Sequence, residues 1–169
     1  MEAGVTSAMR LSVIVPVLNE AHALPALLEY LASLHRSGAE VMLVDGGSED
    51  GSAAIATCAG FEVIRADRGR ARQMNAGAAA VHGDVLLFLH ADTLLPEHAF
   101  ARIEQVCAGG KFAAGAFSLG IDSRHPLLRC IEFTANLRTF FTRIPYGDQA
   151  PFISRQLFRE LGGYREIPI

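Results

Sequence analysis

Residues 85–96 read VLLFLHADTLLP, in which five apolar residues lead directly into His90, Ala91 and Asp92. A short apolar run of this kind predicts a strand that is buried on both faces, and turn residues normally follow such a strand. Here the strand leads into two potential metal ligands, since carboxylate oxygens and imidazole nitrogens both bind divalent cations. The chemistry indicated is therefore that of a cation held at the end of a buried strand.

A second acidic side chain stands at a strand end in VDGGSEDG, residues 44–51. The expected roles of Ser48, Glu49 and Asp50 are structural, with Ser48 capping a helix and the two acids stabilising its first turn. Capping does not require an acid at the strand edge, so Asp45 is a candidate binding residue. The stretch lacks G-K-[ST] and G-x-G-x-x-G, and thus lacks the usual markers of ATP and nicotinamide sites.

Arginines and one further aspartate add candidates for anion binding and proton transfer. Arg65, Arg68, Arg70 and Arg72 are close together before an alanine-rich segment. Guanidinium groups match phosphate oxygens, so Arg70 or Arg72 is expected to hold a diphosphate, the alternative being a solvated helix start. Asp148, in YGDQAPF, is either a general base for an acceptor hydroxyl or a turn aspartate bonded to its own backbone.

The elements that must position these side chains alternate between strand-like and helix-like segments. The strands are expected at 11–17, 40–46, 61–66 and 84–91, and the helices at 21–35, 48–60, 70–83 and 96–107. This alternation predicts a parallel sheet with helices on its faces, and ligands bind such sheets at the carboxyl ends of the strands. The candidate residues gather at that edge.

The second half of the chain, residues 111–169, is expected to supply a pocket wall on the acceptor side. It contains a strand-like segment at 111–121, a helical one at 125–143, and a strand, helix and glycine stop at 150–164. Arg129, Arg138 and Arg143 lie in the helical segment among phenylalanines. One interpretation is an amphipathic face that touches a membrane or a lipid-linked acceptor. The favoured interpretation is a packed helix with solvated arginines.

Size and composition indicate one globular domain over 11–169, after a frayed leader at 1–10. The chain has 169 residues, 50% of them hydrophobic, and a net charge of -3, which argues against a nucleic-acid partner. No apolar stretch approaches the length of a transmembrane segment, and the N-terminus lacks the apolar core of a signal peptide. Three cysteines without C-x-x-C spacing indicate neither disulfides nor zinc. A cytoplasmic location is expected, with peripheral membrane association as the alternative.

Four stretches resemble the family 2 glycosyltransferases of the GT-A fold, which use nucleotide-diphosphate sugars. They are VIVPVLNE (13–20), VDGGSEDG (44–51), NAGAAAVHGDVLLFLHAD (75–92) and FISRQLFRELGGYRE (152–166), and they occur in the family's order. The resemblance implies an α/β three-layer sandwich with a mostly parallel sheet of strand order 3-2-1-4. It also implies that Asp92 holds Mn²⁺ or Mg²⁺ on the donor diphosphate. The residues implied to contact the nucleotide are Pro16, Asn19, Glu20, Asp45 and Gly46.

The implied activity is sugar transfer to an acceptor hydroxyl by single displacement with inversion. The sequence departs from the family's D-x-D pattern by placing His90 first, so His90 is a second metal ligand, a hydrogen-bonding partner of ribose or phosphate, or a structural residue. Alternatives are a nucleotide-sugar-binding protein without catalysis and a nucleotidyltransferase. The loop PVLNEAHALP lacks the glycines and lysine that the latter favours.

The end of the chain, GGYREIPI, bears on the catalytic base. In the family resembled, an acidic pair that supplies the base soon follows such a stretch. The sequence is therefore expected to be a truncated form of a longer protein. Otherwise Asp148 or Glu166 serves as base, or the domain binds the donor without transferring the sugar.

Overall fold

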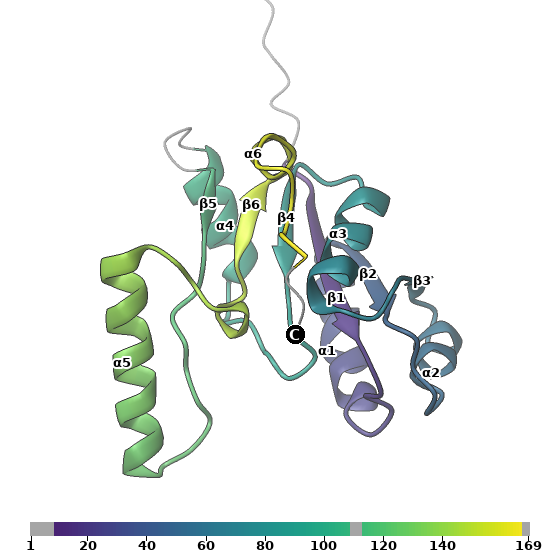
Figure 1. The fold of residues 1–169 in the computed structure, drawn as a ribbon, viewed down its shortest axis with the longest axis horizontal. Coiled ribbons are helices and arrows are strands. Elements are labelled where there is room, and N and C mark those ends of the chain that lie inside the picture. The colour runs from purple at the N-terminus through teal and green to yellow at the C-terminus, as the bar shows by residue number, and fades with distance from the viewer. Residues whose placement is uncertain (1–8, 109–112, 167–169) are drawn as a thin grey trace, which may run out of the picture.

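The computed structural model describes residues 9–108 and 113–166 (Figure 1). Most of the expected leader and the final IPI lie outside these ranges, as do residues 111–112 of the expected strand. Within the described ranges, six strands form one sheet in the order β3-β2-β1-β4-β6-β5. The strands are β1 Leu11–Val17, β2 Glu40–Asp45, β3 Glu62–Arg65, β4 Val85–Phe88, β5 Ala114–Gly115 and β6 Phe152–Ser154. The helices are α1 Leu24–Arg36, α2 Ser52–Cys58, α3 Arg70–Ala80, α4 Ala99–Ala108, α5 Pro126–Thr142, α6 Arg155–Glu160 and the 3-10 turn η1 Gly147–Gln149.

The parallel strands β3, β2, β1 and β4 confirm the predicted order. Beyond them, β6 pairs antiparallel with β4, and β5 pairs antiparallel with β6. The carboxyl ends of β1, β2 and β3 consequently meet the end of β4 at one edge. The second half of the chain thus extends the same sheet, and its expected role as a pocket wall stays a prediction.

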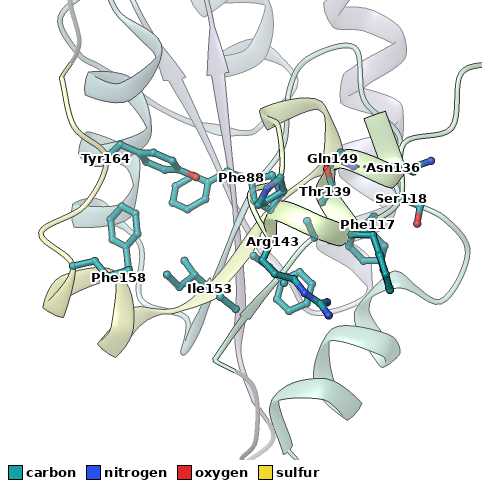
Figure 2. A pocket seen from close by; sticks show the side chains of 18 of the residues that line it. Phe88, Phe117, Ser118, Asn136, Thr139, Arg143, Gln149, Ile153, Phe158 and Tyr164 are labelled. Carbon is teal, nitrogen blue, oxygen red and sulfur yellow. Dashed lines mark hydrogen bonds between the residues drawn. The ribbon is translucent and has the colours of Figure 1, made fainter. Parts of the chain in front are cut away.

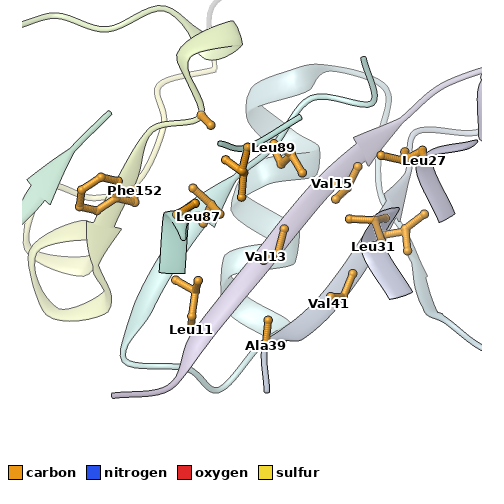
Figure 3. Packing of buried hydrophobic residues seen from close by; sticks show 14 of the residues in the cluster. Leu11, Val13, Val15, Leu27, Leu31, Ala39, Val41, Leu87, Leu89 and Phe152 are labelled. Atoms are coloured by element: carbon orange, nitrogen blue, oxygen red, sulfur yellow. The ribbon is translucent and has the colours of Figure 1, made fainter. Parts of the chain in front are cut away.

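The core has two layers because successive residues of β1 point to opposite faces of the sheet. Val13 and Val15 face α1 and α4 and pack in a cluster with Leu31 and Leu87 (Figure 3). Ile14 faces α3 on the other side, where Gly77 lets the helix approach closely: a Cβ at Gly77 would overlap the Ile14 side chain. α3 is therefore held tightly over the central strands that carry the site.

Two expectations about the loops are wrong in detail. The fourth strand ends at Phe88, so His90 and Asp92 lie in the turn that follows it. α2 begins at Ser52 after Gly51, whose φ of 86° is left-handed, and no acid occupies its first turn. Ser48 does not cap this helix, because its hydroxyl instead accepts a hydrogen bond from the backbone N–H of Asn19 at 2.9 Å.

α5 overturns the favoured interpretation of a packed helix. It stands to one side of the sheet, beyond β5 and β6 (Figure 1), and none of its residues, all of them in the described ranges, is buried. Phe133 is 65% exposed and Phe141 is 73% exposed. A helix with this much exposed aromatic surface indicates an interaction site. Among the described helices, none has the length and apolar character needed to cross a membrane.

Candidate active site

The loops after β1 and β2 are joined into one rim by hydrogen bonds between them. Asn19, with a left-handed φ of 55°, accepts the backbone N–H of Glu49 on its side-chain oxygen at 2.9 Å. The N–H of Glu20 donates to the Ser52 hydroxyl, also at 2.9 Å. Two loops that are separate in sequence thus hold each other in place, and the predicted nucleotide contacts Asn19 and Glu20 lie on this rim.

Asp45 lies at the end of β2 and shapes the turn that follows it. Its side chain is buried, and its carboxylate accepts the backbone N–H groups of Gly47 and Ser48, each at 3.1 Å. The N–H of Gly46 donates to the carbonyl of Val17 at 2.9 Å, which ties the turn to β1. A carboxylate can accept further hydrogen bonds beyond these two. Its contact with a nucleotide stays a prediction.

Gln73 of α3 is a site-building residue that sequence reasoning missed. It is 3% exposed, and its amide nitrogen donates to the carbonyls of Val17 and Val44, both at 2.8 Å. It also lies directly under Gly46, where an added Cβ would come within 2.9 Å of the Gln73 amide. The available signal was its spacing of one helical turn before Gly77, which places both residues on the face that packs on the sheet.

Gln73→Leu should lower the free energy of unfolding by about 1–3 kcal/mol, because it leaves buried carbonyls at two strand ends without their side-chain donor. Urea denaturation followed by circular dichroism measures this change. Gln105→Leu is the matched control, since Gln105 lies exposed on α4 and surface substitutions usually stay within about 0.5 kcal/mol. Equal stabilities of the two variants would contradict the role given to Gln73.

The turn after β4 carries His90, and the charges of Arg70, Asp92 and Asp148 all act on it. Burial lowers the pKa of His90, and the positive charge of Arg70 lowers it further, while the charges of Asp92 and Asp148 oppose the shift. The imidazole is therefore neutral at pH 7. Its Nε2 is buried without a hydrogen-bond partner in the described chain, and a Cβ at Gly147 would lie 2.5 Å from it. His90 thus packs directly against the turn that carries Asp148.

The metal-ligating side chains in this turn suit a cation that takes most of its ligands from substrate phosphates and water. Within the described ranges, no three side chains of His, Cys, Asp or Glu come together as a metal site. Mg²⁺ is usually bound by one or two protein carboxylates, with substrate phosphates and water completing its shell. The exposed carboxylate of Asp92 fits that role, and Nε2 of His90 faces Gly147 instead.

The structure separates the two candidate arginines. Arg72 forms an ion pair with Glu166 at 2.9 Å and lies 3.9 Å from Asp67. Arg70 has no ion pair with a described residue, and its charge acts on His90. The binding of a diphosphate by Arg70 stays a prediction, and Arg72 is the less suitable of the two because it is already ion-paired. Glu166, the alternative base, is already engaged by Arg72.

Asp148 belongs to η1, which is fixed by Gln149. The buried Gln149 side chain accepts hydrogen bonds from the Thr139 hydroxyl and the Tyr146 N–H, both at 2.9 Å. Its backbone carbonyl accepts the N–H of Phe117 at 2.8 Å. No hydrogen bond from the described backbone reaches the Asp148 carboxylate, contrary to the alternative of a turn aspartate. The turn holds Asp148 beside His90 and leaves its carboxylate free.

Fold and site together define an open α/β domain that binds ligands at the carboxyl ends of its parallel strands, with polar and charged groups converging there. The chain belongs to glycosyl transferase family 2, whose family model matches residues 12–158. The predicted family and the GT-A type of fold are thereby confirmed.

One curated relative is the undecaprenyl-phosphate 4-deoxy-4-formamido-L-arabinose transferase of Serratia proteamaculans, 32% identical over 117 residues, which are 63% of this chain and 36% of that protein. A mannosyltransferase from Pyrobaculum calidifontis, solved in complex with GDP-Man and Mn²⁺, superposes with a TM-score of 0.71 at 24% identity, covering 95% of this chain and 48% of that one. Glucosyl-3-phosphoglycerate synthase from Mycobacterium tuberculosis, solved with Mn²⁺ and UDP-glucose, gives a TM-score of 0.66 at 20% identity over 89% of this chain and 57% of that one. The chain spans about a third of that curated relative and about half of each solved structure.

Proposed function

We propose that this protein transfers a sugar from a nucleotide-diphosphate donor to an acceptor hydroxyl, with inversion and with the help of a divalent cation. The observation that carries this function is the turn after β4, where Asp92 is exposed and the His90 ring packs on Gly147, next to the exposed Asp148. These residues lie at the same sheet edge as the rim that carries Asn19 and Asp45. Family membership supports the class of reaction, and the complexes of the two structural neighbours support the donor and the cation.

Two parts of this edge bind two parts of the nucleotide-sugar donor. The rim residues Pro16, Asn19, Glu20, Asp45 and Gly46 contact the base and ribose. Asp92 would hold Mn²⁺ or Mg²⁺, and Arg70 binds phosphate oxygens of the donor. When bound, the cation would supply positive charge to the departing diphosphate, which would lower the barrier to breaking the glycosidic bond. His90 is neutral and packs on Gly147. It thereby fixes the position of η1, which carries Asp148, relative to the turn that carries Asp92.

The acceptor lies on the side of η1. Asp148 removes the proton of the acceptor hydroxyl as that oxygen attacks the anomeric carbon from the face opposite the diphosphate. We further propose a lipid-linked acceptor and a cytoplasmic protein that associates with the membrane surface. The name of the Serratia relative, which refers to undecaprenyl phosphate, supports this acceptor class, and so do the exposed aromatic residues of α5.

A nucleoside diphosphate with Mn²⁺ should raise the melting temperature. Ligand at about 100 times its dissociation constant adds roughly 2.7 kcal/mol, which corresponds to a shift of roughly 5–10 °C for a domain of this size. Differential scanning fluorimetry with UDP, GDP, CDP and TDP, each with and without Mn²⁺, measures the shift and identifies the base. Unchanged melting with all four nucleotides would contradict the donor site.

A further inference from the structure

α5 is attached to the rest of the domain chiefly through polar side chains. None of its residues, all of which the structure describes, is buried. A pocket of about 1090 Å³ lies between α5 and the strands β5 and β6 (Figure 2). A helix that buries no apolar side chain gains little of its position from the hydrophobic effect, the dominant favourable term in folding. The hydrogen bonds between α5 and its neighbours therefore fix where the helix stands.

Asn136 bonds α5 to two separate segments at once. Its amide nitrogen donates to the carbonyl of Leu119 at 2.9 Å, and its side-chain oxygen accepts the N–H of Leu119 at 2.8 Å. The same oxygen accepts a hydrogen bond from Nε2 of Gln149 at 3.3 Å. Asn136 thus pairs with the backbone that follows β5, and it also reaches the 3-10 turn η1.

Thr139, one turn further along α5, completes the hydrogen bonding of the Gln149 side chain (Figure 2). Its hydroxyl donates to Oε1 of Gln149 at 2.9 Å, and the N–H of Tyr146 donates to the same oxygen at the same distance. The amide of Gln149 can form four hydrogen bonds, and described residues supply three of them. Because Gln149 is 2% exposed, water cannot readily replace a donor that is lost.

Asp148 is consequently held from both sides within η1. The residue before it, Gly147, packs against the His90 ring, where an added Cβ would lie 2.5 Å from Nε2. The residue after it, Gln149, is bonded to α5. The place of the Asp148 carboxylate therefore depends on the turn after β4 on one side and on α5 on the other.

We propose that Asn136 and Thr139 are positioning residues for the base of the transfer reaction. They hold the Gln149 amide, and thereby fix η1 and the direction in which Asp148 meets the acceptor hydroxyl. The proposal rests on the proposed function, in which Asp148 is that base. It adds that α5, and not η1 alone, determines the geometry of proton transfer, for which a misplacement of about 1 Å can cost about a hundredfold in rate.

Thr139→Val removes the hydroxyl and keeps the shape of the side chain. It should lower kcat by about tenfold and leave KM for the donor unchanged, because it displaces the base and not the donor-binding residues. Thr139→Ser keeps the hydroxyl and should transfer like the parent protein. Thr134→Val is the matched control, since the Thr134 hydroxyl bonds only carbonyls of α5 itself among the described residues. Equal losses of kcat in Thr139→Ser and Thr139→Val would overturn the role of the hydroxyl.

Hydrogen exchange of the Tyr146 amide reports the position of Gln149 without any catalysis. This N–H donates to Oε1 of Gln149, so it loses protection when the Gln149 amide moves. Exchange measured by NMR should become about tenfold faster in Thr139→Val and in Asn136→Ala. It should stay unchanged in Thr134→Val. Unchanged exchange at Tyr146 in both Thr139→Val and Asn136→Ala would overturn the positioning role.

A double-mutant cycle with Asp148→Asn tests whether the effect on kcat passes through the base. In the Asp148→Asn background, Thr139→Val should change kcat by less than about twofold. An equal loss in both backgrounds would overturn the proposal. If Asp148→Asn loses kcat while Thr139→Val does not, the positioning role alone is wrong. If Asp148→Asn itself transfers like the parent protein, the base of the proposed function is wrong, and the positioning role is rejected with it.

Discussion

Asp92→Asn should lower kcat/KM for sugar transfer by about a hundred- to a thousandfold. An amide carries no charge to hold the cation, and a cation on the departing diphosphate contributes several kcal/mol to transition-state stabilisation, at 1.36 kcal/mol for each factor of ten. Because Asp92 is exposed, the free energy of unfolding should change by no more than about 0.5 kcal/mol. Transfer assays at several Mn²⁺ concentrations, together with urea denaturation, measure both quantities.

Asp45→Asn is the informative comparison for Asp92→Asn. Binding of a nucleoside diphosphate should lose its dependence on Mn²⁺ in Asp92→Asn, whereas in Asp45→Asn it should weaken both with Mn²⁺ and with EDTA. The difference follows from the places of the two carboxylates: Asp92 is exposed after β4, and Asp45 is buried in the rim. Identical losses in both variants under both conditions would indicate general structural damage and contradict the separate roles.

Asp148→Asn should lower kcat by about 10²–10⁴-fold, the usual contribution of a general base, while donor binding stays unchanged. The asparagine keeps the shape of the side chain but cannot take up the acceptor proton. η1 should stay in place, because Gln149 and its hydrogen bonds to Thr139 and Tyr146 remain. The measurement pairs a transfer assay with calorimetry of donor binding.

Asp122→Asn provides the control for Asp148→Asn, since Asp122 is another exposed aspartate in the second half of the chain. Its transfer rate should match that of the parent protein. Glu166→Gln tests the competing base, and it should act mainly by releasing Arg72 from its ion pair. A larger loss of kcat in Glu166→Gln than in Asp148→Asn would transfer the role of base to Glu166.

The sequence by itself determined the central part of the fold. The runs 11–17 and 40–46 are apolar and rich in β-branched residues, and helical patterns separate the strand-like segments. Local composition and periodicity are enough to specify such elements, and their alternation leaves few arrangements other than a parallel sheet. The family motifs supplied the strand order, and the edge at which Asp45 and Asp92 gather followed from the parallel arrangement.

Only the tertiary structure decided which side chains form ion pairs and hydrogen bonds and which helix faces are buried. Arg70 and Arg72 are equivalent in sequence, but Arg72 pairs with Glu166, 94 residues away, whereas Arg70 has no ion pair with a described residue. Nothing in the sequence indicates that Gln73 bonds the carbonyls of Val17 and Val44. Val17 is 56 residues away along the chain. α5 has the periodicity of a packed helix and yet buries none of its residues. Periodicity reports which face of an element is apolar, whereas burial and pairing depend on partners far along the chain, which only the folded arrangement brings into contact.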